Sequence, residues 1–205
     1  MGILYRDGES AADGTTLIRK DARRAFELFR RAAHAGEPKA MYEVANILTE
    51  SKLTTKALTA AVKLYRRSFH LGESAAAFNL ATKYRYLGRH TEAVRWYRKA
   101  LAAGDSSALI PLARAELYGL GTRRNVASGL ERLRRMSRDR TTYVPAHWLP
   151  CEAMVILAQL YIEGWLVRRN LETAVRWLRR AAAWDSEDAK LHLARLGRAL
   201  ARDRG

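Results

Sequence analysis

The sequence predicts an all-α solenoid, a row of stacked helix pairs, and two observations carry this prediction. Two short patterns recur along the 205 residues, and in both the apolar side chains follow the 3.6-residue period of a helix. The chain also holds only four prolines and 13 glycines, too few for a fold rich in β-turns. With 48% hydrophobic residues it has enough apolar surface for a sizeable core. A lone helix pair cannot bury its apolar face, so the pairs are expected to stack.

The first pattern marks the second helix of each pair, and it begins with a small residue and ends in two basic ones. It reads AFELFRR from Ala25, AVKLYRR from Ala61, AVRWYRK from Ala93, AVRWLRR from Ala174 and, in a weaker copy, GLERLRR from Gly129. Asp21, Asn125 and Asn170 each stand four residues earlier, where a side-chain oxygen caps a helix. Gly36, Gly72, Gly104 and Asp185 stand eleven residues later, and the three glycines suit a left-handed cap. Each copy is therefore predicted to be one helix with defined ends.

The second pattern marks the first helix of each pair, an alanine followed by an apolar residue and another alanine. The copies are Ala40/Val44/Ala45, Ala76/Leu80/Ala81, Ala108/Leu112/Ala113, Ala153/Leu157/Ala158 and Ala189/Leu193/Ala194. Their starts lie 36, 32, 45 and 36 residues apart. The long spacing predicts an insertion at residues 141–150, and the last copy predicts a capping helix at 188–203. Leu4 and Tyr5 before Gly8 resemble the end of a first helix, so we expect a single array over 1–205 whose first repeat is incomplete.

These patterns together resemble the Sel1-like repeat family, a relative of the tetratricopeptide repeat. The residues that carry the resemblance are ALIPLARAELYGLGTRRNVASG from Ala108, AMVILAQLYIEGWLVRRNLETAVRWLRRAA from Ala153 and DARRAFELFRRAAHAGEPKA from Asp21. The resemblance implies a right-handed α-α superhelix of about four and a half helix-pair repeats, with first helices lining a concave wall. Gly129, Arg132 and Arg140 occupy positions that are usually small or apolar, so the repeat that contains them is expected to pack loosely or to bend the array.

No set of residues in the sequence forms a recognisable catalytic or metal site. The five histidines are scattered without ligand spacing: His34, His70, His90, His147 and His192. The single cysteine, Cys151, excludes an internal disulfide and a cysteine-based zinc site. The sequence also shows no phosphate-binding glycine loop, no nucleophilic serine turn and no paired carboxylates on matching helix faces. We therefore predict that the protein is not an enzyme and needs no metal or cofactor.

The strongest compositional feature is positive charge, with 37 lysines and arginines against 21 acidic residues and a net charge of +16. Ten of these cations occupy the same two positions in the five second helices, and we call them the basic ladder: Arg30, Arg31, Arg66, Arg67, Arg98, Lys99, Arg134, Arg135, Arg179 and Arg180. A basic surface attracts a protein with an acidic surface or an acidic polymer, such as nucleic acid or an anionic polysaccharide. The same pattern is also typical of a solvated helix face.

A second candidate surface lies on the first helices, where residues that packing does not require vary from copy to copy. We call the predicted partner-binding set the first-helix wall: Glu43, Asn46, Asn79, Thr82, Arg114 and Gln159. Pro111 and Ile156 complete the register that begins with Glu43 and Asn79. Such variation fits a surface that recognises one partner, and it fits an unconstrained solvated face equally well.

The predicted insertion supplies a third candidate, a loop anchor made of Tyr143, His147 and Trp148 between two prolines. Aromatic residues dominate the energetics of protein interfaces, which favours an exposed anchor. The alternative is that Trp148 folds back over the weak repeat before it, because a large exposed tryptophan is uncommon.

The function predicted from these features is a non-catalytic scaffold or adaptor that binds a partner protein on its concave face. The alternatives are binding of an acidic polymer along the basic ladder and, as the resemblance implies, an immunity protein that neutralises a toxin. No apolar run approaches the roughly 18 residues of a membrane span, and the N-terminal sequence MGILYRDGES lacks a signal core. We expect a cytoplasmic protein, or a periplasmic one if an export signal has been removed. The oligomeric state stays open.

Overall fold

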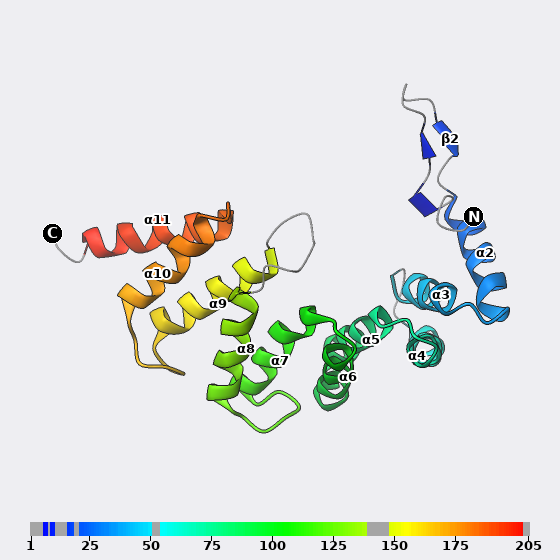
Figure 1. Cartoon of the computed structure of the whole chain (residues 1–205), viewed down its shortest axis with the longest axis horizontal. Coiled ribbons are helices and arrows are strands. Elements are labelled where there is room, and N and C mark those ends of the chain that lie inside the picture. The colour runs from blue at the N-terminus through cyan, green and yellow to red at the C-terminus, as the bar shows by residue number, and fades with distance from the viewer. Residues whose placement is uncertain are drawn as a thin grey trace. The chain divides into compact units, whose positions relative to one another are not determined.

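The computed structural model describes residues 6–7, 9–10, 16–18, 21–50, 54–138 and 148–202. The molecule divides into two compact units, Met1–Leu87 and Gly88–Gly205, which we call unit 1 and unit 2. Each unit consists of helices that pack on their neighbours along the sequence, and Figure 1 shows their order. The predicted fold class, an all-α array of helix pairs, is therefore confirmed.

Among its described residues, unit 1 has a short two-stranded antiparallel sheet followed along the sequence by the helices α2 to α5. The elements are β1 (Glu9–Ser10), β2 (Thr16–Ile18), α2 (Ala22–His34), α3 (Pro38–Glu50), α4 (Thr55–His70) and α5 (Ala75–Tyr86). The two strands pair with Glu9 opposite Ile18 and Ser10 opposite Thr16, and the sequence patterns did not predict them. Helix α3 packs against α2 on one side and against α4 and α5 on the other, so it lies at the centre of this unit.

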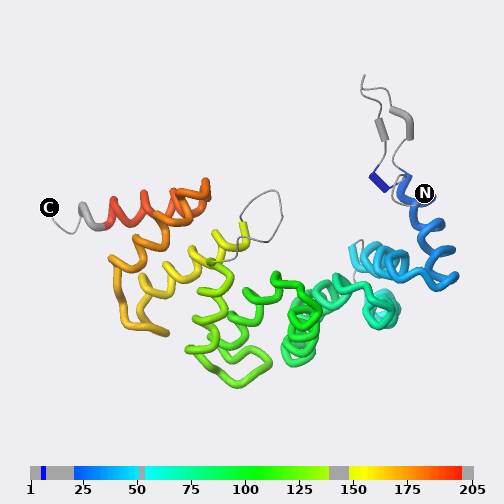
Figure 2. The backbone as a smooth tube through the Cα atoms, viewed as in Figure 1, coloured from blue at the N-terminus to red at the C-terminus, as the bar shows by residue number. Residues whose placement is uncertain are grey.

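Unit 2 contains the remaining helices. They are α6 (His90–Ala102), the 3-10 turn η1 (Ser106–Ala108), α7 (Leu109–Tyr118), α8 (Val126–Arg138), α9 (Trp148–Glu163), α10 (Leu171–Ala182) and α11 (Glu187–Arg202). Each helix packs on the next, and α9 also contacts α11. The backbone of this unit turns back on itself between successive helices, as Figure 2 shows. First helices α7, α9 and α11 thus alternate with second helices α8 and α10.

The predicted N-terminal and C-terminal ends of these helices are confirmed. The three predicted caps accept a hydrogen bond from a backbone N–H three residues on: Asp21 from Arg24 at 2.9 Å, Asn125 from Ser128 at 3.0 Å and Asn170 from Thr173 at 2.8 Å. The predicted C-terminal positions all have a positive φ: Gly36 at 99°, Gly72 at 103°, Gly104 at 93° and Asp185 at 62°. Local chemistry therefore sets the length of these helices.

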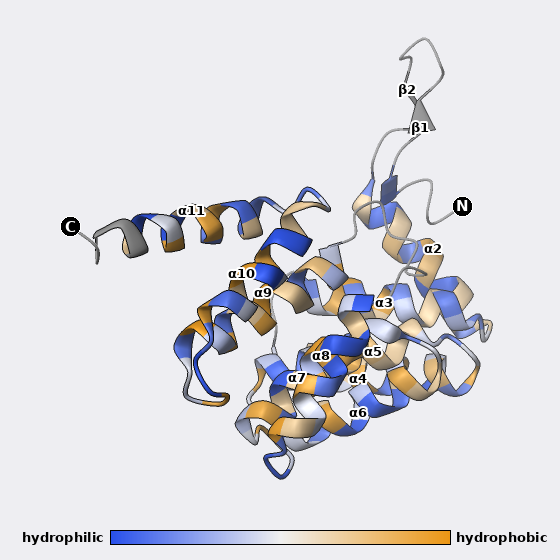
Figure 3. Ribbon diagram, turned by 60° about the vertical axis from the view of Figure 1, so that its left-hand side comes forward, coloured by the Kyte–Doolittle hydropathy of each residue, from blue (hydrophilic) through white to orange (hydrophobic). Residues whose placement is uncertain are grey.

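The cores are built from the repeated alanines and the apolar residues beside them. The first alanine of each pattern is buried in every described copy, which lets neighbouring backbones approach closely: Ala25, Ala40, Ala61, Ala76, Ala93, Ala108, Ala153, Ala174 and Ala189. Tyr65, Trp96 and Tyr97 are also buried, and half-buried Trp177 packs against two core clusters of unit 2. Figure 3 shows hydrophobic and hydrophilic residues alternating around the helices.

The weak repeat packs tightly, so the expectation that it packs loosely is wrong. Leu133 and Met136 of α8 are fully buried in the main core cluster of unit 2. A Cβ added to Gly129 would lie 2.7 Å from the Cγ of Leu117, so glycine is what allows α8 to approach α7. Arg140 lies outside the described residues.

The predicted insertion ends earlier than its sequence boundary. Helix α9 starts at Trp148, so the last three residues of the interval 141–150 belong to a helix, and the rest of it lies outside the described residues. Pro150 is tolerated there because it lies in the first turn, whose amide groups have no partner within the helix. The predicted capping helix at 188–203 corresponds to α11 within one residue at each end. Leu4 and Tyr5 lie outside the described residues.

Candidate functional site

The first-helix wall lies on helices α3 and α5 in unit 1 and on α7 and α9 in unit 2. The helical period explains its position. Ala40 and Val44 of α3 face the core, and Glu43 and Asn46, three residues apart, form the stripe beside them. The sequence pattern thus fixed which side of each first helix these residues occupy, and their contacts differ between the two units.

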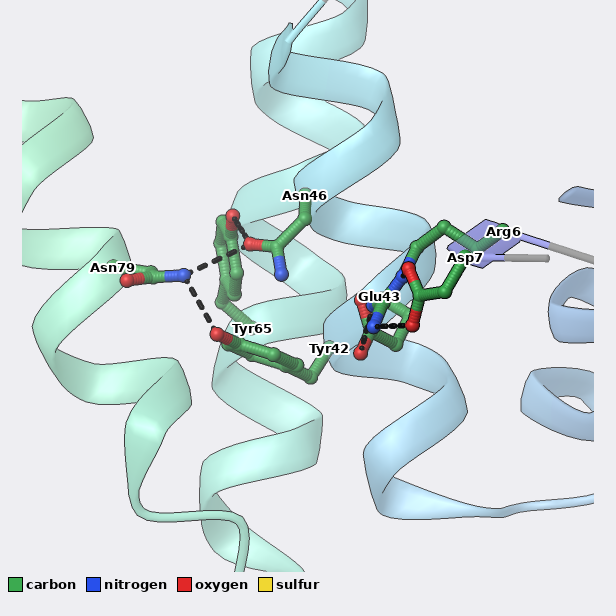
Figure 4. A network of polar contacts seen from close by, with 7 residues as sticks. All are labelled: Arg6, Asp7, Tyr42, Glu43, Asn46, Tyr65 and Asn79. Atoms are coloured by element: carbon green, nitrogen blue, oxygen red, sulfur yellow. Dashed lines mark hydrogen bonds and ion pairs between the residues drawn. The ribbon is translucent and has the colours of Figure 1, made fainter. Parts of the chain in front are cut away.

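In unit 1 a partly buried polar network joins three helices (Figure 4). The Oδ1 atom of Asn46 accepts hydrogen bonds from the Tyr65 hydroxyl at 2.6 Å and from Nδ2 of Asn79 at 2.9 Å. The same Nδ2 atom donates to the hydroxyl oxygen of Tyr42 at 3.0 Å. Tyr65 is fully buried, so its hydroxyl needs this partner. The network holds both asparagines in fixed orientations.

The network leaves one donor and one acceptor unused. Because Asn46 takes part through Oδ1 and Asn79 through Nδ2, the Nδ2 atom of Asn46 and the Oδ1 atom of Asn79 remain. In the part of the chain that the structure describes, neither atom makes a hydrogen bond. Both residues are half-buried, and the network fixes the orientation of their side chains.

Glu43 is buried, with 6% of its surface exposed, and is paired within the chain. Its Oε1 atom lies 2.7 Å from Nη1 of Arg6, whose Nε donates to Asp7 at 2.8 Å (Figure 4). The hydrogen bonds to Asp7 and Glu43 raise the pKa of Arg6 above its ordinary range. A buried carboxylate is costly without a partner, so a ligand that reaches Glu43 has to compete with Arg6.

In unit 2 the wall residues also bridge neighbouring first helices. Nη2 of Arg114 on α7 lies 3.1 Å from Oε1 of Glu152 on α9. Burial raises the pKa of Glu152, and the charge of Arg114 opposes this rise. Nε2 of Gln159 on α9 lies 3.3 Å from Nε2 of His192 on α11. Thr82, the remaining member, is half-buried on α5 of unit 1.

The basic ladder lies on the second helices, as predicted, and eight of its ten residues are exposed. Its two half-buried members are Lys99 and Arg134. The Nζ atom of Lys99 lies 4.2 Å from the ring centre of Trp96, and Arg180 lies over Trp177 at 5.8 Å. These two cations place their charged groups over aromatic rings, a contact that a solvated helix face also makes.

The predicted loop anchor is only partly described. Tyr143 and His147 lie outside the described residues. Trp148 is the first residue of α9 and is 52% exposed, so it does not fold back as a buried plug over the preceding repeat.

The sequence patterns missed an exposed aromatic cluster at the ends of the first helices of unit 2. Tyr118 and Trp165 lie in contact there, with ring centres 5.6 Å apart. One sequence feature could have revealed this cluster: Trp165 directly follows Gly164. A tryptophan in such a loop does not belong to the apolar core stripe of the helix before it or of the helix after it. They also missed Tyr42 and His192, whose contacts depend on how helices face each other.

Within the described residues, no group of three or more histidine, cysteine, aspartate or glutamate side chains could hold a metal ion. The thiol of Cys151 is buried, and this burial raises its pKa. None of the described helices has the length and apolar character needed to cross a membrane.

Comparison with solved structures identifies similar folds. A protective antigen of uropathogenic Escherichia coli strains, displaying an SLR fold, is 22% identical, with a TM-score of 0.68 over 95% of this chain. This chain spans only 40% of the length of that antigen. A Sel1 repeat protein from Oxalobacter formigenes is 20% identical, with a TM-score of 0.65 over 92% of this chain and 72% of its own. An immunity protein from Pseudomonas aeruginosa is 19% identical, with a TM-score of 0.48 over 81% of this chain and 60% of its own, a likeness too loose to bear on function.

A search of curated proteins gives no significant match. The family model described as Sel1 repeat matches four segments, residues 2–37, 38–73, 74–105 and 151–183, which together cover more than half of the chain. The unmatched stretch contains the weak repeat, although α7 and α8 pack there as a helix pair. The chain belongs to the Sel1 repeat family, whose fold typically serves in protein–protein interaction.

Proposed function

We propose that this protein is a non-catalytic scaffold that binds a partner protein through its first-helix wall. The observation that carries the proposal is the polar network of unit 1, which presents Nδ2 of Asn46 and Oδ1 of Asn79 without a hydrogen-bond partner among the described residues. A free donor and a free acceptor on neighbouring helices match the two polar groups of a peptide bond.

The network also lowers the cost of binding. An unordered side chain loses about 0.5–1.5 kcal/mol of rotamer freedom when an interface immobilises it. Tyr42 and Tyr65 already fix the two asparagines, so this entropy is lost on folding rather than on binding. In unit 2, Arg114 and Gln159 are ordered in a similar way by Glu152 and His192.

Charge supports a partner with an acidic surface. The chain carries a net charge of +16, and exposed cations steer an acidic partner toward it before contact. A toxin that this chain neutralises as an immunity protein would be one such partner.

The test starts from affinity capture out of nuclease-treated host lysate at low and at physiological salt, followed by purification of the retained protein. Calorimetry then compares variants. Asn46→Asp removes the free amide donor of Asn46 and keeps the oxygen that Tyr65 and Asn79 bind. We expect Asn46→Asp and Arg114→Glu each to weaken binding about tenfold, the loss of one or two interface hydrogen bonds.

The matched control is Arg98→Glu with Lys99→Glu on the second helix α6, which we expect to change affinity by less than about threefold. The proposal fails if the control variant loses as much affinity as the wall variants, or if no protein survives physiological salt. Circular dichroism confirms that each variant keeps its helix content.

A second candidate function is binding of an acidic polymer along the basic ladder. The observation in its favour is a set of exposed cations that make no hydrogen bond or ion pair among the described residues: Arg31, Arg67, Arg135 and Arg179. In that case heparin and polyuridylate retain the wild type, the double variant of Arg98 and Lys99 weakens retention, and affinity falls steeply as salt rises.

A further inference from the structure

The end of helix α7 and the loops that follow α7 and α9 expose large apolar side chains at one edge of unit 2. These side chains are Tyr118, Leu120 and Trp165, which we call the loop-edge patch and which are 42%, 42% and 59% exposed. The rings of Tyr118 and Trp165 lie 5.6 Å apart between centres at an interplanar angle of 34°. Large apolar side chains gathered at a surface mark an interaction site more often than single ones do.

The two loops have the same internal structure, so the patch is held in place. Gly119 and Gly164 end the first helices with φ values of 74° and 79°, in the left-handed region that favours glycine. The backbone N–H of Asn125 donates to the carbonyl of Glu116 at 2.8 Å, and that of Asn170 donates to Tyr161 at 2.9 Å. Each hydrogen bond closes its own loop, and in both loops the two bonded residues are nine positions apart in the sequence. Leu120 and Trp165 each follow the left-handed glycine, and they are therefore equivalent residues of successive repeats.

Trp165 is oriented by a hydrogen bond of its own. Its indole Nε1 donates to Oε2 of Glu163 at 2.6 Å. This contact satisfies the polar edge of the indole, and the part of the apolar ring that Tyr118 does not cover is left for a ligand. A fixed, half-exposed tryptophan is the kind of side chain that anchors protein interfaces.

The charge around the patch is positive and repeats with it. Each loop carries two consecutive arginines at equivalent positions, and all four are exposed: Arg123, Arg124, Arg168 and Arg169. None of the four makes a hydrogen bond or ion pair with another described residue. The carboxylate of Glu163 lies beside the patch and is engaged by the Trp165 indole. Unpaired arginines beside an apolar anchor select a ligand that combines acidic and apolar side chains.

We propose that the loop-edge patch docks an acidic polypeptide segment of a partner, with an aliphatic or aromatic side chain against Trp165 and Leu120 and its carboxylates on the loop arginines. This second interaction surface is independent of the first-helix wall, since none of its residues belongs to that wall.

A protein segment fits the patch better than single-stranded nucleic acid does. Stacking of successive bases needs open aromatic faces. Tyr118 covers part of the Trp165 ring, and the residue that corresponds to Trp165 in the preceding repeat is the aliphatic Leu120.

The test measures fluorescence anisotropy of a labelled peptide in which glutamate and aspartate alternate with leucine and phenylalanine. We expect saturable binding to the full chain and at least about tenfold weaker binding to Trp165→Ala, as for an interface anchor. Arg123→Ser with Arg168→Ser is expected to weaken binding about tenfold and to reduce its salt dependence. Leu120→Ala provides a second apolar variant if Trp165→Ala alters the helix content.

Matched controls separate the patch from general stickiness and from the wall. Trp148→Ala removes another exposed tryptophan of unit 2, Arg135→Ser removes an exposed arginine of α8, and Asn46→Asp changes the wall; all three are expected to bind like the wild type.

Several results would overturn the proposal. One is equal binding of the same peptide with glycine in place of leucine and phenylalanine, which would mean charge attraction alone. Another is a loss in Trp148→Ala equal to that in Trp165→Ala, or no binding of the peptide to the wild type. A further one is tighter binding of labelled oligothymidine that depends on Trp165, which would assign the patch to nucleic acid. Failure of the wall variants in the preceding test leaves these outcomes unaffected.

Discussion

The Nε atom of Arg132 lies 2.8 Å from Oε2 of Glu116, and this ion pair ties helix α8 to helix α7. The hydroxyl of Ser128 donates to the same oxygen at 2.7 Å. Glu116 is buried, so its carboxylate depends on these two partners. An arginine at a position that is usually apolar is therefore matched by a carboxylate on the facing helix, and the weak repeat keeps its packing.

Arg132→Ala is expected to lower the free energy of unfolding by about 2 kcal/mol, because it leaves the buried Glu116 carboxylate with only one partner. This expected loss of unfolding free energy is smaller than the loss for a fully buried ion pair, because the Arg132 side chain is 25% exposed. Urea unfolding followed by circular dichroism measures the change. Arg135→Ala on the same helix is the control and should stay within about 0.5 kcal/mol of the wild type. Equal losses in both variants would show that the ion pair contributes nothing specific.

Gly129→Ala is expected to destabilise the protein by about 1–3 kcal/mol, the usual cost of overpacking. The added Cβ would lie 2.7 Å from Leu117 Cγ and 2.9 Å from the carbonyl oxygen of Ala113, and a backbone carbonyl does not move aside easily. Thermal unfolding of this variant is compared with Gly197→Ala. Gly197 lies in helix α11 with nothing within 4 Å of its added Cβ, so alanine there is expected to stabilise by about 0.5–1 kcal/mol. Opposite signs for the two glycines are the required result.

The features that local chemistry determines were predictable from the sequence. Asp21, Asn125 and Asn170 cap helices because their side chains reach an amide three residues away, and no distant residue takes part. The repeated alanines predicted the helix pairs because a small residue at a fixed register is needed wherever two helices pack closely. The polar contacts of the wall could not be predicted in the same way. Asn79 meets Tyr42 and Asn46 only after α3, α4 and α5 have packed, and no spacing rule specifies that arrangement.

The weak repeat illustrates the same limit. Gly129 and Arg132 depart from the repeat pattern, and a pattern treats each departure as a defect. The structure shows that each is complemented by a residue of α7, Leu117 for the glycine and Glu116 for the arginine. Compensation between two helices is visible only when both positions are compared in three dimensions. Trp165 was missed for a related reason, since its contact with Tyr118 joins the loop of one repeat to the end of helix α7 in the preceding repeat.

Arg114→Ala is expected to raise the pKa of Glu152 further above its ordinary value. Burial already raises this pKa, and the variant removes the positive charge that opposes the rise. Because the folded-state pKa then exceeds the unfolded-state value by more, the contribution of Glu152 to stability is present at low pH and is lost over a wider interval as pH increases. The expected loss at neutral pH is about 0.5 kcal/mol, since the Arg114 side chain is half exposed and solvent screens the pair.

A pH titration of Glu152 by nuclear magnetic resonance measures the pKa, and urea unfolding at acid and neutral pH measures the stability. Arg179→Ala, an exposed arginine on α10, serves as the control. Exchange of the two charges, Arg114→Glu with Glu152→Arg, should recover part of the loss. An unchanged pKa in Arg114→Ala would show that the pair is not formed in solution.

Tyr65→Phe is expected to change both the stability of the protein and its dependence on pH. Below pH 10 the variant loses the hydrogen bond to Asn46 Oδ1, a cost of about 1 kcal/mol. Burial raises the pKa of Tyr65 to about 12, so between pH 10 and 12 the unfolded chain releases this proton while the folded chain keeps it. The stability of the wild type therefore falls as pH rises through this interval, and Tyr65→Phe removes that part of the fall. Urea unfolding at a series of alkaline pH values should show the two curves approaching each other above pH 10 and crossing before pH 12, because the fall in the wild type exceeds the roughly 1 kcal/mol of the hydrogen bond. Tyr86→Phe, at a tyrosine that is 70% exposed, should follow the wild type throughout, and parallel curves for Tyr65→Phe and the wild type would mean that the Tyr65 hydroxyl is solvated.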